Sequence, residues 1–217
     1  MRDGEVLAAE SRPLRHGHAE ALFPMIERVM AEAGLAPAQL DAIAAAIGPG
    51  GFTGIRVGLA AAHGIALAVG ARLIGISSFA AVAARVAGTG QPACERLLVA
   101  LDSRRSDLYV QLFARDAALP LAEPQALPAD QLADYVAGRD LRSLLIAGDA
   151  AEAAAAALGG RAHCAVAAGS APDARGVAAA AFVELRSGVL AGPVRPLYLR
   201  PPDVTLPKRP QPLGPAS

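Results

Sequence analysis

Residues 46–70, AIGPGGFTGIRVGLAAAHGIALAVG, constrain the fold more strongly than any other stretch of the chain. Five of the nine residues from Ile47 to Ile55 are Gly or Pro, a density that favours a tight loop. The apolar, small-residue run that follows favours a helix over residues 54–69, with Thr53 as its predicted N-cap. A glycine-rich loop before a helix is a common phosphate-binding arrangement, because the first N–H groups of the helix are free to bind an anion.

The loop matches neither of the two common nucleotide-binding motifs. The Walker motif needs a lysine after its last glycine, and the only lysine of this chain is Lys208, in the C-terminal tail. The dinucleotide motif G-x-G-x-x-G, begun at Gly48, would require a glycine where the chain has Thr53. The sequence therefore predicts no nucleotide site of either class, and it leaves open an anion at the start of the helix.

The charge balance and the hydropathy argue against two kinds of partner. Lys plus Arg and Asp plus Glu are both 20, so the chain lacks the basic excess that marks a dedicated nucleic-acid surface. The most apolar segment, residues 54–71, contains Arg56 and His63, which argues against a membrane-spanning helix. We therefore expect no membrane partner and no dedicated nucleic-acid site.

Short apolar segments alternate with amphipathic ones in the first half of the chain, which favours layers of helices on a sheet. The helix predicted over residues 18–35 has an apolar face with the spacing i, i+3, i+4, i+7, and Gly34 ends it. That face consists of Leu22, Met25, Ile26, Val29, Met30 and Ala33. The predicted strands are 5–11, 40–48 and 72–78, and the predicted helices are 18–35, 54–69 and 79–88.

The predicted boundary between two lobes, residues 1–92 and 93–192, lies at Gly88–Pro92. Residues 193–217 hold eight prolines and are predicted to form an extended, mobile tail. Within the second lobe the predicted elements are a β-hairpin over 96–114 with Leu108, Val110 and Leu112 on one face, a short helix at 128–138, a strand at 143–149, and helices at 151–159 and 171–188, the last begun by Asp173.

A stripe of small residues runs along the predicted helix 54–69. Gly54, Gly58 and Ala62 recur every four residues, and Ala61 and Ile65 flank them. Two glycines inside a helix cost about 1 kcal/mol each relative to alanine, so the stripe suggests that another helix approaches at backbone distance. The spacing does not decide whether that helix is the 18–35 helix of this chain or a helix of a partner.

Four segments, in order along the chain, match the motifs of one known family. HGHAEALFPMI resembles the helix start H-[ST]-E-x-L-x-P-x-[IV], and GPGGFTGIRVGLAAAHGIA resembles the signature G-P-G-[SG]-F-T-G-[LIV]-R-[IV]-G. ALDSRRSDLYVQLF resembles the hairpin [IV]-D-A-R-x-x-[EQ]-[VI]-Y, and RPLYLRPPD resembles the closing motif P-x-Y-[LV]-R. These are motifs of the bacterial TsaB family, also called YeaZ, which the chain resembles over about residues 4–203. The matched residues are His18, Arg56, Asp102, Arg104, Tyr109, Tyr198 and Arg200, together with the loop residues Gly48, Pro49, Gly50, Gly51, Phe52 and Thr53.

The resemblance implies an ASKHA-type α/β fold of two lobes, the fold of actin, Hsp70 and sugar kinases. It implies a cytoplasmic, non-catalytic subunit in the synthesis of N6-threonylcarbamoyladenosine in tRNA. The implied partner is the catalytic subunit TsaD, which docks through a four-helix bundle to which this chain contributes its two N-terminal helices. The ATPase TsaE joins that pair, tRNA is reached only indirectly, and the chain alone is expected to be able to form a homodimer. The implied interface residues are Leu22, Met25, Ile26, Val29, Gly54, Gly58, Ala61, Ala62 and Ile65.

The same resemblance implies that this chain alone binds no cofactor and no metal, because ATP and the metal ion belong to the partner subunits. Family chains also open with two strands, the first bearing an I-D-T-[SA] turn, before the segment that matches residues 4–11. Two strands and a turn take about 15–20 residues. The N-terminal lobe is therefore expected to be truncated, or in-frame sequence upstream of Met1 is expected to encode these strands.

Other candidate groups have ordinary structural interpretations. His16 and His18 alternate as two metal ligands could, but no Asp, Glu or Cys is evidently paired with them. Ser77–Ser78 lacks a G-x-S-x-G motif and suits a helix cap. No catalytic role is predicted for Asp102, Asp107 or Asp149, and Arg104–Arg105 is interpreted as a solvated turn. The alternatives that stay open are an ATP-dependent small-molecule kinase or carbamoyl-transfer enzyme of the same fold, and a homodimeric interaction module.

Overall fold

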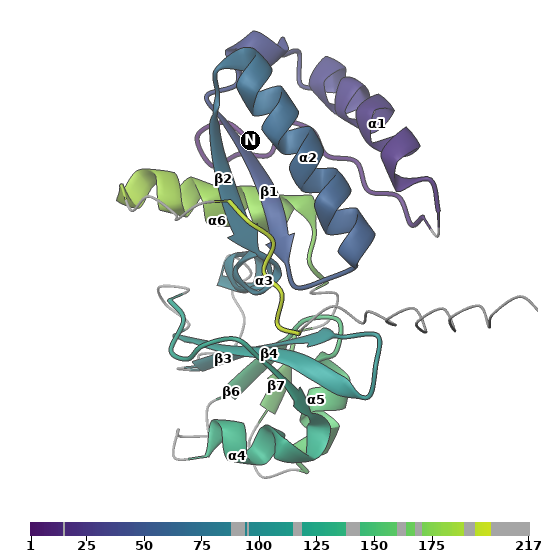
Figure 1. The fold of residues 1–217 in the computed structure, drawn as a ribbon. Coiled ribbons are helices and arrows are strands. Elements are labelled where there is room, and N and C mark those ends of the chain that lie inside the picture. Colours follow the sequence, from purple (N-terminus) through teal and green to yellow (C-terminus); the bar gives the residue numbers. More distant parts are fainter. Residues whose placement is uncertain are drawn as a thin grey trace, which may run out of the picture.

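The structure is a computed structural model that describes residues 1–14, 16–87, 94, 96–114, 119–137, 144–159, 164–167, 171–188 and 194–200. Two lobes are stacked one above the other, with helix α3 (Ser78–Ala87) between them (Figure 1). Each lobe is a sheet with helices packed against it, as the alternation of predicted strands and helices indicated.

The sheet of the N-terminal lobe consists, within the described residues, of β1 (Ala42–Gly48) and β2 (Arg72–Ser77), which run parallel. Helix α2 (Phe52–Val69) covers one face, where Leu59 and Ala62 pack against β1. Helices α3 and α6 (Ala174–Ser187) cover the other face. Helix α1 (His18–Glu32) lies outside α2, and the short 3-10 helix η1 (Pro37–Gln39) leads from α1 to β1.

Two local predictions for this lobe are wrong. Residues 5–11 form no strand; instead the backbone groups of Arg2 and Glu5 bond each other, at N–O distances of 2.9 and 2.8 Å. A strand needs a neighbour for its backbone groups, and β1 pairs only with β2 among the described residues. Thr53 is not an N-cap, because Gly51 occupies that position in an extended conformation and the helix already begins at Phe52.

The C-terminal lobe is a five-stranded sheet of order β5-β4-β3-β6-β7. Its centre is the predicted hairpin, in which Leu108, Val110 and Leu112 face α4 and α5, while Phe113 faces α3 on the opposite side. The strands β5 and β7 had no counterpart in the sequence prediction. The elements are β3 (Arg96–Asp102), β4 (Asp107–Ala114), β5 (Gln125–Pro128), η2 (Ala129–Gln131), α4 (Leu132–Val136), β6 (Leu144–Ala147), α5 (Ala151–Ala157) and β7 (Cys164–Val166).

Helix α6 packs with the N-terminal lobe, although the sequence boundary placed its residues in the second lobe. Gly176 brings its backbone against α3, since an added Cβ would lie 2.3 Å from the carbonyl oxygen of Ala81. Asp173 caps α6 by accepting a hydrogen bond from the Gly176 N–H at 2.8 Å, as predicted, and it binds Arg85 of α3 at 2.6 Å. The division in sequence is therefore not the division in space, and the predicted boundary at residues 88–92 lies outside the described residues.

The segment 194–200 also returns to the body of the protein. It has no regular secondary structure, yet it crosses from the N-terminal sheet to the hairpin of the C-terminal lobe (Figure 1). This part of the predicted tail is packed, not free, because its apolar residues find partners: Val194 joins the cluster under α2, and Leu199 joins the cluster under α3. The remainder of the predicted tail lies outside the described residues.

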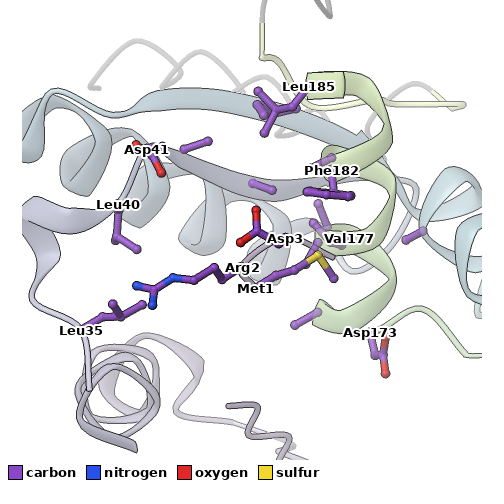
Figure 2. A pocket seen from close by; sticks show the side chains of 18 of the residues that line it. Met1, Arg2, Asp3, Leu35, Leu40, Asp41, Asp173, Val177, Phe182 and Leu185 are labelled. Atoms are coloured by element: carbon purple, nitrogen blue, oxygen red, sulfur yellow. The ribbon is translucent and has the colours of Figure 1, made fainter. Parts of the chain in front are cut away.

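A groove with a volume of about 710 Å³ lies between β1 and α6. Its side chains come from the chain start, from the segment that leads into β1, and from α6, where Val177, Phe182 and Leu185 contribute an apolar wall (Figure 2). Charged groups, among them Asp41 and Asp173, stand at its margin. The groove is on the opposite face of the sheet from α2 and so is separate from the helices that the sequence analysis singled out.

Candidate functional site

Helices α1 and α2 lie side by side on the outer surface of the N-terminal lobe (Figure 1). No residue of α1 is buried, and only 17% of the 18 residues of α2 are buried. By length and composition α2 could also cross a membrane, so its apolar character alone does not identify what it contacts. The pair presents apolar surface that this chain leaves largely uncovered.

The most exposed large apolar side chains of the two helices are not those that the sequence analysis selected. Phe23 is 52% exposed and Leu67 is 86% exposed, whereas the predicted interface residues Leu22, Met25, Ile26 and Val29 are all half-buried. The i, i+3, i+4 spacing identifies the apolar stripe that packs against the rest of this chain. It does not identify exposed apolar side chains on the other faces of the helix. The exposure of Leu67 could have been inferred from the sequence, because Leu67 lies on a different face of the helix from the inward Leu59, Ala62 and Ala66.

The glycine stripe divides into open and closed positions. At Gly54 and Gly58 no described heavy atom lies within 4 Å of an added Cβ, so no helix in the described part of the chain packs at backbone distance there. Ala62 is 6% exposed and packs on β1, so this chain itself covers most of that residue. The reason is that a four-residue repeat drifts around the helix by about 40° per step, which carries the third member into the core. Ala61 and Ile65 are half-buried beside the stripe.

The glycine loop is shaped around a segment far along the chain. Gly48 has φ +111°, in the left-handed region that favours glycine, and an added Cβ would lie 2.9 Å from the carbonyl oxygen of Leu197. The N–H of Leu197 donates to the carbonyl oxygen of Ile47 at 2.8 Å. Gly48 therefore lets residues 194–200 approach the loop at backbone distance. Pro49, Gly50 and Gly51 complete the connection to α2.

Arg56 contacts two exposed aromatic rings at the start of α2. Its guanidinium carbon is 3.6 Å from the ring centroid of Phe52 and 5.8 Å from that of Tyr198, distances typical of cation–π contacts. Its Nε donates to the hydroxyl of Tyr198 at 2.9 Å, and the two rings stack with their centroids 5.7 Å apart. The structure thus brings together Arg56 and Tyr198, two motif residues 142 positions apart.

The hairpin motif forms a second group of polar contacts. The Asp102 N–H donates to Oδ1 of Asp149 at 2.9 Å, and Oδ1 of Asp102 accepts from the Arg104 N–H at 2.7 Å. Arg104 has φ +61°, in the left-handed region, and both its backbone N–H and its side chain contact the carboxylate of Asp102. These contacts fit the predicted turn, and Tyr109 lies half-buried on the strand that follows.

Asp107, at the start of β4, is the most enclosed charged residue of this region, with 2% of its surface exposed. Its Oδ1 accepts from the hydroxyl of Ser103 at 2.8 Å, and its Oδ2 forms an ion pair with Arg200. A buried carboxylate requires such partners, because an isolated buried charge is strongly disfavoured. Sequence reasoning missed this pair, which joins residues 93 positions apart.

Charged groups surround the helix pair. Arg28 of α1 donates to both carboxylate oxygens of Glu10, at 3.0 and 2.7 Å, and holds the pKa of that carboxyl below its ordinary value. His18 is the exposed first residue of α1, and among the described residues no three His, Cys, Asp or Glu side chains gather to hold a metal ion. What the site offers is apolar and aromatic contact area with a charged margin, which suits the binding of other helices.

Comparisons with known proteins place the relatives of this chain in one tRNA modification pathway. A family model described as TsaD, tRNA N6-adenosine threonylcarbamoyltransferase, matches residues 12–161. The tRNA threonylcarbamoyladenosine biosynthesis protein TsaB of Haemophilus influenzae is 35% identical over 99 residues, which are 46% of this chain and 41% of that protein. A tRNA N6-adenosine threonylcarbamoyltransferase of Erythrobacter litoralis is 58% identical over 60 residues, 28% of this chain and 17% of that protein. The chain thus spans less than half the length of these curated relatives.

A solved structure matches over most of both chains. YeaZ from Pseudomonas aeruginosa superimposes with a TM-score of 0.72 and 26% sequence identity, covering 87% of this chain and 87% of that one. The likeness gives this chain an ASKHA-like α/β fold, as the motif resemblance implied.

Proposed function

This chain belongs to the TsaB (YeaZ) family of tRNA threonylcarbamoyladenosine biosynthesis proteins, and we propose that it is a non-catalytic scaffold subunit that docks the catalytic subunit TsaD. In this proposal α1 and α2 form the docking surface, ATP and the metal ion belong to the partner subunits, TsaE joins the pair, and tRNA is contacted only through the complex. The proposed location is the cytoplasm.

One observation carries the proposal: a long apolar helix that packs on its own sheet with few residues and leaves large apolar side chains in the open. Leu67 and Phe52 of α2 are 86% and 46% exposed, and Phe23 of the adjoining α1 is 52% exposed. Exposed aromatic and aliphatic side chains that share one surface mark interaction sites more often than chance, because their burial against a partner releases water. Two helices side by side on a surface offer ridges and grooves into which the side chains of partner helices can pack.

The test uses two variants that add the same charge at exposed apolar positions on different helices. Leu67→Glu lies on α2, and Val183→Glu lies on α6, where Val183 is 57% exposed. Both sites are exposed, so each variant should stay within about 0.5 kcal/mol of wild-type stability. In titrations of the folded chain against TsaD, Leu67→Glu should weaken binding by more than tenfold, about 1.4 kcal/mol, because the carboxylate would be buried in the complex. Val183→Glu should bind as the wild type does.

Equal weakening by both variants would place the docking surface elsewhere, and failure of the wild-type chain to bind TsaD would refute the scaffold proposal. The enzyme alternative, an ATP-dependent kinase or carbamoyl-transfer protein of this fold, is favoured by the local 58% identity to a threonylcarbamoyltransferase. It predicts turnover by the chain without partners, whereas the scaffold proposal predicts turnover only when TsaD is present. A homodimer through α1 and α2 would compete with TsaD, so sedimentation with and without TsaD distinguishes the interaction module.

A further inference from the structure

The segment Val194–Arg200, which we call the strap, contacts both lobes within seven residues. On the N-terminal lobe, Val194 lies so close to β2 that its Cγ1 would be 3.0 Å from a Cβ added at Gly75. The N–H of Leu197 then bonds the carbonyl oxygen of Ile47 at 2.8 Å, at the entrance to the glycine loop. The strap therefore runs from β2 to the end of β1, at the beginning of α2.

The other end of the strap is anchored in the C-terminal lobe. Leu199 packs against the cluster that contains Val99 and Phe113, and Arg200 pairs with the carboxylate of Asp107. Because Asp107 is only 2% exposed, loss of the Arg200 cation would leave a buried charge with Ser103 as its remaining side-chain partner. Loss of this anchor is consequently costly, and the anchor fixes one position along the strap.

Tyr198 lies between these two attachments and is the only residue of the strap with a described side-chain hydrogen bond to α2. Its hydroxyl accepts from Nε of Arg56, and its ring stacks on Phe52, the first residue of α2. The N-cap of the helix makes no side-chain hydrogen bond, and the strap adds the contacts of Tyr198 to this first turn.

We propose that the strap couples the C-terminal lobe to the first turn of α2: the Arg200–Asp107 pair fixes the strap, and Tyr198 then fixes the start of the helix. This inference rests on the proposed function for its consequence, which is that the position of α2, and so the docking of TsaD, depends on residues in the other lobe. Arg200 and Tyr198 act as positioning residues, since they set the geometry of a surface without forming most of it.

Hydrogen exchange of the free chain tests the coupling without any partner. The Ile55 N–H, which bonds the carbonyl oxygen of Gly51 at 3.0 Å, reports on the first turn of α2. In Arg200→Gln this amide should exchange on the order of tenfold faster than in the wild type, although the substitution lies in the opposite lobe. The matched control is Arg85→Gln, which removes another ion pair between elements, with Asp173, but touches no residue of the strap. It should leave Ile55 unchanged.

Tyr198→Leu gives a second route that leaves the Asp107 ion pair in place, because Tyr198 is 45% exposed and buries no charge. It should also speed exchange at Ile55 on the order of tenfold and weaken TsaD binding, while Tyr198→Phe, which keeps the ring but loses the hydroxyl, should fall between it and the wild type. Unchanged exchange at Ile55 in folded Tyr198→Leu would overturn the proposal. Faster exchange in Tyr198→Leu, together with a wild-type chain that does not bind TsaD, would support the strap and refute the scaffold function.

Discussion

Substitutions of Gly58 should affect the stability of the free chain and its binding to TsaD in different ways. No heavy atom lies within 4 Å of a Cβ added at this position, which is in the interior of α2. Alanine at a helix interior is favoured over glycine by about 1 kcal/mol. With no clash to offset that gain, Gly58→Ala should raise the free energy of unfolding by about 0.5–1 kcal/mol. For a chain of 217 residues this corresponds to a melting temperature higher by about 1–4 °C.

The same substitution at Gly176 should have the opposite sign. A Cβ there would lie 2.3 Å from the Ala81 carbonyl oxygen and 2.8 Å from Cγ of Arg85, so α3 and α6 would have to separate. Forced overpacking of this kind typically costs about 1–3 kcal/mol, which exceeds any gain in helix propensity. Urea unfolding followed by circular dichroism measures both variants on one scale. Destabilisation by Gly58→Ala would show that an element of this chain packs on the stripe after all.

The size of the side chain at position 58 should also change the affinity for TsaD. Gly58→Leu keeps the open Cβ position and adds a branched side chain to the surface of α2, where a partner helix would approach. We expect binding to TsaD to weaken by more than tenfold, about 1.4 kcal/mol, while the circular dichroism spectrum stays that of a folded chain. A folded Gly58→Leu chain that binds TsaD as tightly as the wild type would remove the stripe from the proposed interface and leave Leu67 as its better marker.

Two further predictions concern stability. Burial raises the pKa of the Glu184 carboxyl above its ordinary value of 4.5, so the folded state holds the proton more tightly than the unfolded state does. The free energy of unfolding should therefore fall as the pH rises above 4.5. Glu184→Gln should remove that fall. In urea titrations the variant should be more stable than the wild type at pH 7 but not at pH 4. Gly148→Ala should lower the free energy of unfolding by about 3 kcal/mol or more, because Gly148 has φ +113° and an added Cβ would clash with the Ala100 carbonyl oxygen. A smaller loss in the same assay would contradict the close approach of the Gly148 backbone, between β6 and α5, to Ala100.

Local patterns predicted those elements whose partners are near in sequence. The hairpin β3–β4 follows from period-two alternation, and its two faces pack into the two clusters that the alternation separates. Ser77, predicted as a helix cap, accepts a hydrogen bond from the Ala80 N–H at 3.0 Å. Both features are decided within a few residues, so the sequence contains what is needed to infer them.

Features that depend on distant partners could not be inferred in the same way. Residues 194–200 have the composition of a mobile tail, because proline supports neither helix nor sheet, yet Arg200 finds a buried carboxylate 93 positions away. Residues 5–11 contain the short apolar run of a strand, but no described strand pairs with them. The place of α6 under the first sheet depends on the space left by Gly176, which composition alone presents as a weak helix position.

The glycines illustrate this limit and also bear on function. Gly48, Gly75, Gly148 and Gly176 all sit where a Cβ would come within 3 Å of another part of the chain, so the folded structure itself requires their small size. Gly54, Gly58 and Gly64 of α2 sit in open space, and each costs the helix about 1 kcal/mol relative to alanine. Nothing among the described contacts of the free chain offsets that cost. The open glycines therefore favour a partner that packs closely on α2, because close packing by a partner requires small residues at positions where the isolated chain does not require them.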